Sequence, residues 1–164
     1  MGRTAVFPER PAFTSGTFSA YSQQIEARQK GTDVTKAKQV SVWVSSSPGQ
    51  IARVARALAR ARVDITAFTS YGSGDEIPVR LLVDSPTRAR KVLRDLDLRV
   101  TEEDVLRLTL PDKPGILAEI AERLADAHIN IDYSYATVAK GAKKSDLVLA
   151  VSDIMGAVKV LKGL

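Results

Sequence analysis

The 164-residue sequence contains no cysteine and only one histidine, and these two absences exclude several kinds of site. Without cysteine the chain has neither disulfides nor thiolate metal ligands, and a reducing compartment is the simpler assumption. His128 has no second histidine with which to share a metal ion, and it stands at the predicted end of a helix, where a cation suits the helix dipole. We therefore expect no catalytic residues, no metal site and no cofactor, in a protein that is not an enzyme.

Long apolar segments are also missing. No apolar run approaches the ~20 residues that a membrane helix needs. The N-terminal region carries Arg3 and Arg10 but no continuous apolar segment of the kind found in secretory signals. We expect a cytoplasmic protein without a membrane partner.

Aromatic residues are few, at 5% of the chain, although the formal net charge of +5 raises the question of nucleic-acid binding. Trp43 and the other aromatic residues do not form a stacking platform with the arginines in sequence, and no RNP-type aromatic motif is present. We expect no nucleic-acid partner.

Residues 1–37 differ from the rest of the chain. They hold three of the four phenylalanines and many small polar residues, and they show no sustained periodicity. We expect a disordered or irregular N-terminal tail. An alternative is that translation naturally begins at Val34.

The first half of the chain alternates strand-like and helix-like patterns. Valines at every second position of residues 40–44 predict a strand, and after Pro48-Gly49 apolar residues return at helical spacing up to about Arg62. The segments that follow predict a strand at 63–68, a hairpin loop at 72–75, a strand at 79–83, a short helix after Pro86 and a fourth strand at 96–100.

This pattern repeats in the second half. Adding 66 to the residue numbers places Pro48-Gly49 on Pro114-Gly115, and Val63-Asp64-Ile65 on Ile129-Asn130-Ile131. Each half is therefore a β-α-β-β-α unit. We predict an α+β fold of two ferredoxin-like βαββαβ domains, 38–102 and 103–164, with antiparallel sheets and helices on one face.

The second unit lacks its final strand, because the chain stops at Leu164 directly after the last predicted helix. Three outcomes stay open. The unit has an exposed edge, or it borrows a strand from the tail, or it borrows one from a second subunit.

The Pro-Gly turns join a strand to a helix. Alternating leucines at 106–110 predict a strand, and the helical period begins at Leu117. Pro114 suits a first helical turn, Asp112 is placed to cap the free N–H groups, and Gly115 leaves the helix mouth without a Cβ. The backbone N–H groups at this mouth suit an anion such as a carboxylate.

Residues 110–117, Leu-Pro-Asp-Lys-Pro-Gly-Ile-Leu, together with Ala127-His128-Ile129-Asn130-Ile131, resemble the opening of an ACT domain. Residues 47–52 and 63–65 are similar to the same signature. Residues 38–164 as a whole resemble small stand-alone proteins made of two tandem ACT domains. The resemblance implies βαββαβ modules that bind amino acids and regulate metabolism.

The resemblance also implies a set of ligand-binding residues, in which a polar residue of the second strand and one of the first loop hold the polar groups of the ligand. By position these are Asp112, Pro114, Gly115, Ile116, Leu117 and Asn130 in the second repeat, and Ser46, Gly49, Gln50, Ile51 and Asp64 in the first.

In a common arrangement of the family, two ACT units lie side by side, so that Asn130 would serve the Gly49 site and Asp64 the Gly115 site. We expect the second turn to hold the ligand, because Asp112 adds an acceptor that Ser46 only partly replaces. A purely structural role stays open. In that alternative Asp112 only caps a helix, Asn130 only ends the connection between a helix and a strand, and Pro-Gly only forms a turn.

The long helices of the two repeats carry opposite charge. The first has Arg53, Arg56, Arg60 and Arg62, whereas the second has Glu119, Glu122 and Asp126 against Arg123. We expect these helices to pair, within the chain or across a homodimer. The alternative is that both are solvated faces, because exposed ion pairs contribute only ~0–1 kcal/mol each.

The sequence thus predicts a regulatory module that binds a small ligand, most simply an amino acid, at the Pro-Gly turns. One alternative is a regulatory subunit that acts by protein contact on an enzyme of amino-acid biosynthesis, in the manner of an acetolactate-synthase small subunit. The other is a structural assembly module without a ligand.

Overall fold

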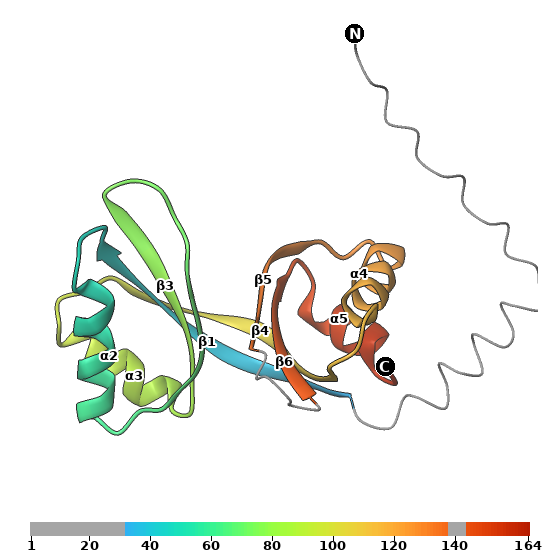
Figure 1. Cartoon of the computed structure of the whole chain (residues 1–164), viewed down its shortest axis with the longest axis horizontal. Helices are drawn as coiled ribbons and strands as arrows, with labels where there is room; N and C mark the ends of the chain where they lie inside the picture. The colour runs from blue at the N-terminus through green and yellow to red at the C-terminus, as the bar shows by residue number, and fades with distance from the viewer. Residues whose placement is uncertain (1–31, 138–143) are drawn as a thin grey trace, which may run out of the picture. The chain divides into compact units, whose positions relative to one another are not determined.

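The computed structural model describes residues 32–137 and 144–164, which form six strands and four helices (Figure 1). Of the predicted tail, residues 1–31 lie outside the described residues. The elements are β1 (Asp33–Ser45), α2 (Gln50–Arg60), β2 (Ile65–Ser70), β3 (Glu76–Val83), α3 (Pro86–Arg94), β4 (Val100–Pro111), α4 (Ile116–Asp126), β5 (Ile131–Thr137), β6 (Lys144–Val151) and α5 (Ile154–Leu161).

The six strands form one antiparallel sheet in the order β2-β3-β1-β4-β6-β5. The even-numbered residues of β1 and β4 face the helices, with Val40 and Val42 against α2 and α3, and Leu106 and Leu108 against α4 and α5. All four helices therefore cover one face of the sheet. The predicted class, an α+β fold with antiparallel strands and helices on one face, is confirmed, but the two expected sheets are joined into one.

The strands β1 and β4 are shared between the two repeats. Residues 39–45 of β1 pair with β3 of the first repeat, while residues 33–42 pair with β4. Residues 106–111 of β4 pair with β6 of the second repeat. Each repeat thus has the strand order 2-3-1-4 of a ferredoxin-like unit, and residues 33–38 of β1 supply the fourth strand that the second repeat lacks. This segment includes residues 33–37, which the sequence analysis placed in the tail.

The predicted strand at 96–100 is wrong. Residues 95–97 form a turn, Asp97 has a positive φ of 63°, and β4 begins only at Val100 and runs on to Pro111. Leu96 and Leu98 produced the apolar signal because both pack on the core of the first repeat from this turn. The fourth strand of the first repeat is the beginning of β4.

Each repeat has its own core between the sheet and its helices. Buried valines of β1 and β3 meet Val54 and Leu58 of α2 in the first repeat, and buried leucines of β4 and β6 meet Ile120 and Leu124 of α4 in the second. Val34 of β1 packs on the second core. The borrowed strand therefore contributes apolar contacts as well as backbone hydrogen bonds.

The helix-free face of the sheet is also buried. Ala67 and Leu82 of the first repeat form one cluster with Val105, Val148 and Ala150. The edge strands β2 and β5 contact each other. The sheet therefore curls so that the helix-free sides of the two repeats meet.

A polar network joins the two repeats where their helix-free sides are in contact. Gln39, which is fully buried, donates from Nε2 to Glu103 Oε1 at 2.7 Å and also to the Tyr133 hydroxyl. Tyr133 donates to the same Glu103 oxygen at 2.6 Å, and Tyr135 donates to Gln39 Oε1 at 2.7 Å. The guanidinium of Arg80 lies 4.5 Å from the centre of the Tyr133 ring. These contacts tie four strands together around the buried Gln39, while Glu103, Tyr133, Tyr135 and Arg80 are half-buried.

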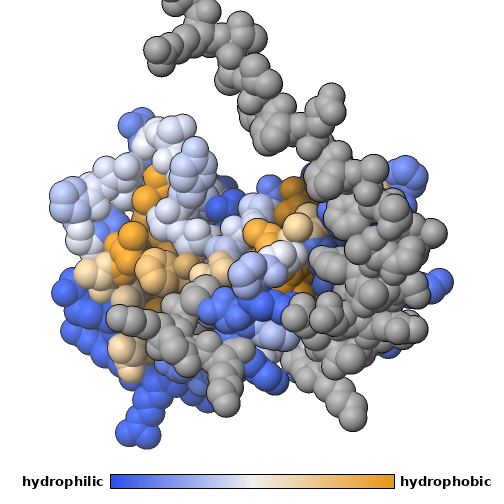
Figure 2. Space-filling view, turned by 45° about the vertical axis from the view of Figure 1, so that its right-hand side comes forward, coloured by the Kyte–Doolittle hydropathy of each residue, from blue (hydrophilic) through white to orange (hydrophobic). Residues whose placement is uncertain are grey.

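Some apolar surface stays open to solvent. The exposed large apolar residues are Ile51, Phe68, Tyr71, Leu117 and Met155. Figure 2 shows one face, on which apolar side chains reach the surface between hydrophilic ones. Among the residues that the structure describes, no helix combines the length and apolar character needed to cross a membrane.

Candidate ligand-binding site

The two strand-to-helix turns have almost the same backbone. Gly49 precedes α2 with φ of 91° and ψ of −11°, and Gly115 precedes α4 with φ of 89° and ψ of −13°. These angles lie in the left-handed region, which glycine adopts without steric cost. Apart from the glycine itself and its chain neighbours, no atom lies within 4 Å of where a Cβ would stand, so each glycine is needed for its backbone conformation and the space beside it is open.

Neither of these helices has a side-chain cap. Helix α5 differs because it has a side-chain cap: Asp153 accepts a hydrogen bond from the Gly156 N–H at 3.0 Å. The first N–H groups of a helix have no partner inside it. At α2 and α4 no side-chain oxygen caps these donors, although the Ile116 N–H of α4 makes a long hydrogen bond of 3.5 Å to the Lys113 carbonyl. The remaining donors and the positive end of the helix dipole suit an anion.

The predicted capping role of Asp112 is therefore wrong. The residue that precedes α4 is Gly115, and Asp112 stands three residues further back, on the exposed end of the loop after β4. A capping side chain acts from the position next to the first turn. The carboxylate of Asp112 is not used by the helix.

Hydroxyl groups surround the first turn. Ser45 and Ser47 place their Oγ atoms 3.0 Å apart, and Gln50 Nε2 donates to Ser47 Oγ at 3.4 Å. The Ser46 N–H donates to the Asp75 carbonyl at 2.7 Å, so the loop between β2 and β3 is fixed to the turn. The residues that line the hollow at this turn include no acidic side chain.

A hollow of about 270 Å³ lies at the first turn. Its walls combine the polar atoms of the turn with apolar side chains, and are formed by Val44, Ser45, Ser46, Ser47, Pro48, Gln50, Ile51 and Ile77. Pockets for drug-sized ligands hold roughly 300–1,000 Å³. This hollow is thus in the range of a smaller molecule.

The structure divides the predicted site residues between the two ends of each helix. Asp64 and Asn130 follow the last turns of α2 and α4, and each of these helices has 11 residues, which spans about 16 Å. The turns containing Gly49 and Gly115 lie at the other ends. Within one repeat the strand residue and the turn cannot reach the same small ligand across the helix.

Asp64 and Asn130 occupy equivalent positions. The Asp64 N–H donates to Asp84 Oδ1 and the Asn130 N–H donates to Ser152 Oγ, both at 3.0 Å. Asn130 also donates from Nδ2 to Asp132 Oδ1 at 2.9 Å. Both side chains are exposed. Both therefore lie at the helix end that is remote from the Pro-Gly turn of their own repeat.

His128 ends α4 with a positive φ of 58°, as Arg62 ends α2 with 55°. The N–H of the residue after each of them bonds back to Leu124 and Leu58 respectively, which closes the last helical turn. His128 is therefore a helix-terminal residue.

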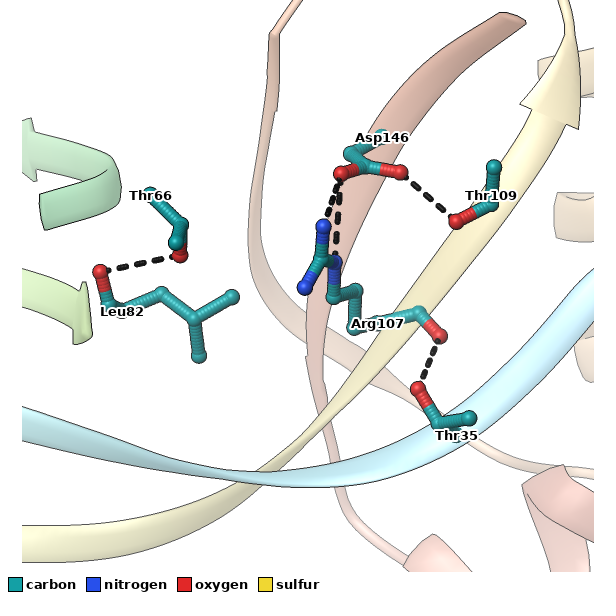
Figure 3. Close-up of polar contacts among 6 residues, drawn as sticks. All are labelled: Thr35, Thr66, Leu82, Arg107, Thr109 and Asp146. Atoms are coloured by element: carbon teal, nitrogen blue, oxygen red, sulfur yellow. Dashed lines mark hydrogen bonds and ion pairs between the residues drawn. The ribbon is translucent and has the colours of Figure 1, made fainter. Parts of the chain in front are cut away.

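The strand that leads into the second turn is held by an ion pair. Arg107 donates from Nε to Asp146 Oδ2 at 3.1 Å, and Thr109 donates to Asp146 Oδ1 at 2.7 Å (Figure 3). Burial raises the pKa of Asp146, but the hydrogen bonds from Thr109 and Arg107 and the arginine charge outweigh it, so the pKa is lowered. This contact fixes β4 to β6 just before the turn.

A larger hollow of about 560 Å³ lies along α3, away from both turns. Its walls are mostly basic side chains, including Arg88, Lys91 and Arg94. It includes Ser85, which precedes α3 and does not cap it with its side chain, but it contains neither of the two glycine turns with left-handed backbone. We therefore place the candidate site at the turns.

Sequence reasoning missed Ser45, Ser47, Val44 and Ile77 as residues around the first turn. The run of three serines at 45–47 was a usable signal, because hydroxyl groups beside a helix mouth bind anions. Ile77 gave no such signal, since it reaches the turn from β3 through its pairing with Val44.

Residues 35–159 match the family model of the ACT domain pair. Because the match covers most of the chain, the chain belongs to this family, and the resemblance inferred from the repeated Pro-Gly turns is confirmed. A comparison with curated proteins gives no match.

Solved structures share the fold. Protein BT0572 from Bacteroides thetaiotaomicron is 26% identical with a TM-score of 0.73, over 79% of this chain and 88% of that one. The ligand-free regulatory subunit of aspartate kinase from Thermus thermophilus is 14% identical with a TM-score of 0.63, over 80% and 95%. Aspartokinase III from E. coli, in complex with aspartate and ADP, is 16% identical with a TM-score of 0.55, over 81% and 32%.

Proposed function

We propose that this protein is a non-catalytic regulatory module whose Pro-Gly turns bind a small ligand, most simply an amino acid. Membership of the ACT domain pair family supports a regulatory, ligand-binding role. The observation that carries the proposal is the pair of matched helix mouths, each opened by a left-handed glycine and left without a side-chain cap. We further propose a cytoplasmic role in amino-acid metabolism.

An amino acid presents a carboxylate and an ammonium group close together, and the turns offer partners for both. The free N–H groups of α2 or α4 suit the carboxylate. At the second turn, Asp112 supplies a carboxylate for the ammonium group, whereas the first turn offers the hydroxyl groups of Ser45 to Ser47. The two sites therefore have unequal affinities, and an amino acid binds more tightly at the second turn.

The remaining polar partners of the ligand come from the C-terminal ends of α2 and α4. Because Asp64 and Asn130 lie about 16 Å from the turn of their own repeat, each serves a turn of another unit. Occupancy of such a shared site shifts the relative population of two arrangements of the units, and this shift is the regulatory signal.

A thermal-shift screen across the amino acids tests the proposal. A ligand at 100 times its Kd adds about 2.7 kcal/mol to the free energy of unfolding, which raises the midpoint by several degrees. Ser46 and Asp112 are equivalent positions, so Asp112→Ser and Ser46→Asp are matched variants.

We expect Asp112→Ser to weaken binding about 10- to 100-fold, because a charge-assisted hydrogen bond contributes ~1.5–3 kcal/mol. Ser46→Asp should leave the tighter site intact. If no amino acid moves the midpoint, the ligand proposal is wrong, and retrieval of a biosynthetic enzyme by pull-down would then favour a subunit that acts by contact.

A further inference from the structure

We propose that the helix-covered side of the first repeat binds the phosphate backbone of double-stranded DNA, without preference for a sequence. This binding is independent of the ligand proposed at the Pro-Gly turns. It is made by six cations on the outer side of α2 and α3, which we call the basic face: Arg53, Arg56, Arg60, Arg88, Lys91 and Arg94.

The two helices carry many positive charges and no negative ones. Helix α2 has 11 residues, of which three are arginine, and α3 has nine residues, of which four are arginine or lysine; neither contains aspartate or glutamate. They pack against each other over the sheet (Figure 1). The positive charges therefore gather on one surface.

The arginines of α2 point away from the core. At about 3.6 residues per turn, Arg53, Arg56 and Arg60 lie within about 60° of one another around the helix axis. They are on the side opposite Val54 and Leu58, which are the buried residues of α2, and all three are exposed.

The cations of α3 also point away from the core. Lys91 lies opposite the buried Ala89 and Leu93, and Arg88 and Arg94 lie about 60° to either side of Lys91. All three cations are exposed, and they line the hollow of about 560 Å³ along α3. An anionic group in this hollow is close to several positive charges at once.

No carboxylate among the described residues forms an ion pair with any cation of the basic face. Asp95, the acid that lines the hollow along α3, is not in an ion pair either. Arg53 donates to the Leu96 carbonyl at 3.0 Å, and Arg88 donates to the Arg62 carbonyl at 3.2 Å. Because a carbonyl is uncharged, these bonds orient the two guanidinium groups and leave their charge for a partner.

The fold does not require these charges. With the offset of 66 between the repeats, the arginines of α2 are replaced on α4 by acids, which are Glu119, Glu122 and Asp126. The expected pairing of these oppositely charged helices inside one chain is not observed, because α2 packs against α3 and α4 packs against α5, and Figure 1 shows the two helix pairs apart. The basic face is therefore open to a partner outside the chain.

The chemistry and spacing of the basic face suit a row of phosphates. Arginine can donate two parallel hydrogen bonds to one phosphate, and each cation that neutralises a phosphate releases a counterion from the DNA. Arg53 and Arg60 are seven residues apart, about 10 Å along α2, which corresponds to roughly three phosphate steps of about 3.4 Å on one DNA strand. Several cations can thus contact the same duplex.

The absence of aromatic residues favours a duplex over a single strand. Neither α2 nor α3 contains an aromatic residue. Proteins that bind single strands stack the bases on aromatic side chains, whereas contacts to the backbone need only charge and hydrogen-bond donors. The sequence-based expectation of no nucleic-acid partner rested on this absence, which excludes stacking but not contacts to a duplex backbone.

An acidic protein surface or an anionic membrane fits the basic face less well. The centre of a protein interface is poor in charge and rich in aromatic residues, and a helix that lies on a membrane inserts apolar side chains. None of the exposed large apolar residues belongs to α3, and Ile51 of α2 lies about 140–180° around the helix axis from the three arginines. The basic face thus offers charge without apolar anchors.

Fluorescence anisotropy of a labelled DNA duplex of about 20 bp, titrated with the full chain, tests the proposal. We expect a Kd of about 10⁻⁶–10⁻⁴ M at physiological salt, and a slope of about −3.6 in log affinity against log salt concentration if about four phosphates are neutralised. A duplex of the same length and unrelated sequence should bind equally well.

Two matched variants separate the basic face from the net charge. Lys91→Gln with Arg94→Gln removes two cations of the basic face, and Lys159→Gln with Lys162→Gln removes the two cations at the equivalent exposed positions of the second repeat, with an offset of 68 between α3 and α5. We expect the first variant to weaken binding at least about tenfold at low salt and to reduce the slope by about two. The second variant should change the affinity less than about twofold, because its cations do not contact the duplex.

Arg56→Gln with Arg60→Gln should weaken binding as the first variant does, and far-UV circular dichroism should confirm that every variant is folded. A wild type that does not bind the duplex at low salt overturns the proposal. Equal weakening by the two matched variants would show that only net charge matters. Tighter binding to a single strand of the same length, or equal binding to poly-glutamate or to vesicles containing phosphatidylserine, would also overturn it, because the partner would then not be a duplex.

Discussion

The negative charge of Asp146 contributes directly to the stability of the sheet in the second repeat. Its carboxylate accepts hydrogen bonds from Arg107 and Thr109 on the neighbouring strand. Thr35 of β1 in turn donates to the Arg107 carbonyl at 3.2 Å, so three strands meet at this contact (Figure 3). The ionised form is favoured because both partners donate to it.

Asp146→Asn should therefore change how stability depends on pH. The folded pKa of Asp146 is lowered, so the carboxylate stabilises the fold above the usual aspartate pKa of about 3.9, and this contribution is lost as pH falls through the lower folded value. We expect the variant to cost about 1–3 kcal/mol at pH 7 and much less near pH 3. Urea unfolding at both pH values measures the difference.

The control is Asp95→Asn, at an exposed position at the C-terminal end of α3. It should leave the free energy of unfolding almost unchanged at both pH values. An equal cost of Asp146→Asn at pH 7 and pH 3 would show that the ionised carboxylate is not what stabilises the sheet.

At the scale of the element, β1 is the strand on which the second repeat depends. Residues 33–38 pair with β4, and Val34 packs on the second core. Without this segment β4 would present unpaired backbone groups and the core would lose part of its cover. The strand thus belongs to the second repeat by contact, although it precedes the first repeat in sequence.

Two truncations test the role of this strand. A chain that begins at Gln39 loses residues 33–38, whereas a reference chain that begins at Thr32 retains them. We expect the shorter chain to be less stable by several kcal/mol, because it loses a run of ladder hydrogen bonds and apolar burial together. Denaturant unfolding compares the two, and equal midpoints would show that the second repeat does not need the strand.

The helices and turns could be predicted because their signals are local. The helical period begins directly after Pro48-Gly49 and after Pro114-Gly115. Because the same pattern occurs in both repeats, the prediction of each helix supports the prediction of the other. The borrowed strand could not be predicted. Residues 33–38 contain only Val34 and Ala37 as apolar residues, and Val34 pairs with Leu108, far along the chain. A pattern read along the chain does not identify such a distant partner.

The candidate site was predictable in part for the same reason. The glycine turns follow from sequence, because a left-handed residue before a helix is a local requirement. The hollow at the first turn could not be predicted, because Ile77 lies beside this turn only through the pairing of β3 with β1. The network of Gln39, Glu103 and Tyr133 likewise joins residues that are distant in sequence.

At the scale of the whole molecule, the two repeats should unfold as one. They share β1 and β4, and the buried network on the helix-free face ties them together. Trp43, the one tryptophan, lies in the part of β1 that pairs with β3, so its fluorescence follows the first repeat. Far-UV circular dichroism follows both repeats.

We expect the two probes to give coincident denaturant transitions. We also expect Tyr133→Phe to lower both midpoints by the same amount, because it removes one hydrogen-bond partner from buried Gln39 and from half-buried Glu103, at a cost of about 1–3 kcal/mol. Ser134→Ala, at the adjacent exposed position of β5, is the matched control. Separate transitions, with only the circular dichroism signal shifted by Tyr133→Phe, would contradict this coupling.

The shared strands also bear on how such a protein can be inherited or engineered. A recombination event or a cloning boundary placed between the repeats, near residue 103, would cut through β4 and leave two fragments that each lack a complete strand. The heritable unit is thus the pair. A gene fusion keeps the fold only if the added sequence is joined before Asp33, after Leu164 or within a loop. The two repeats therefore evolve together as parts of one gene.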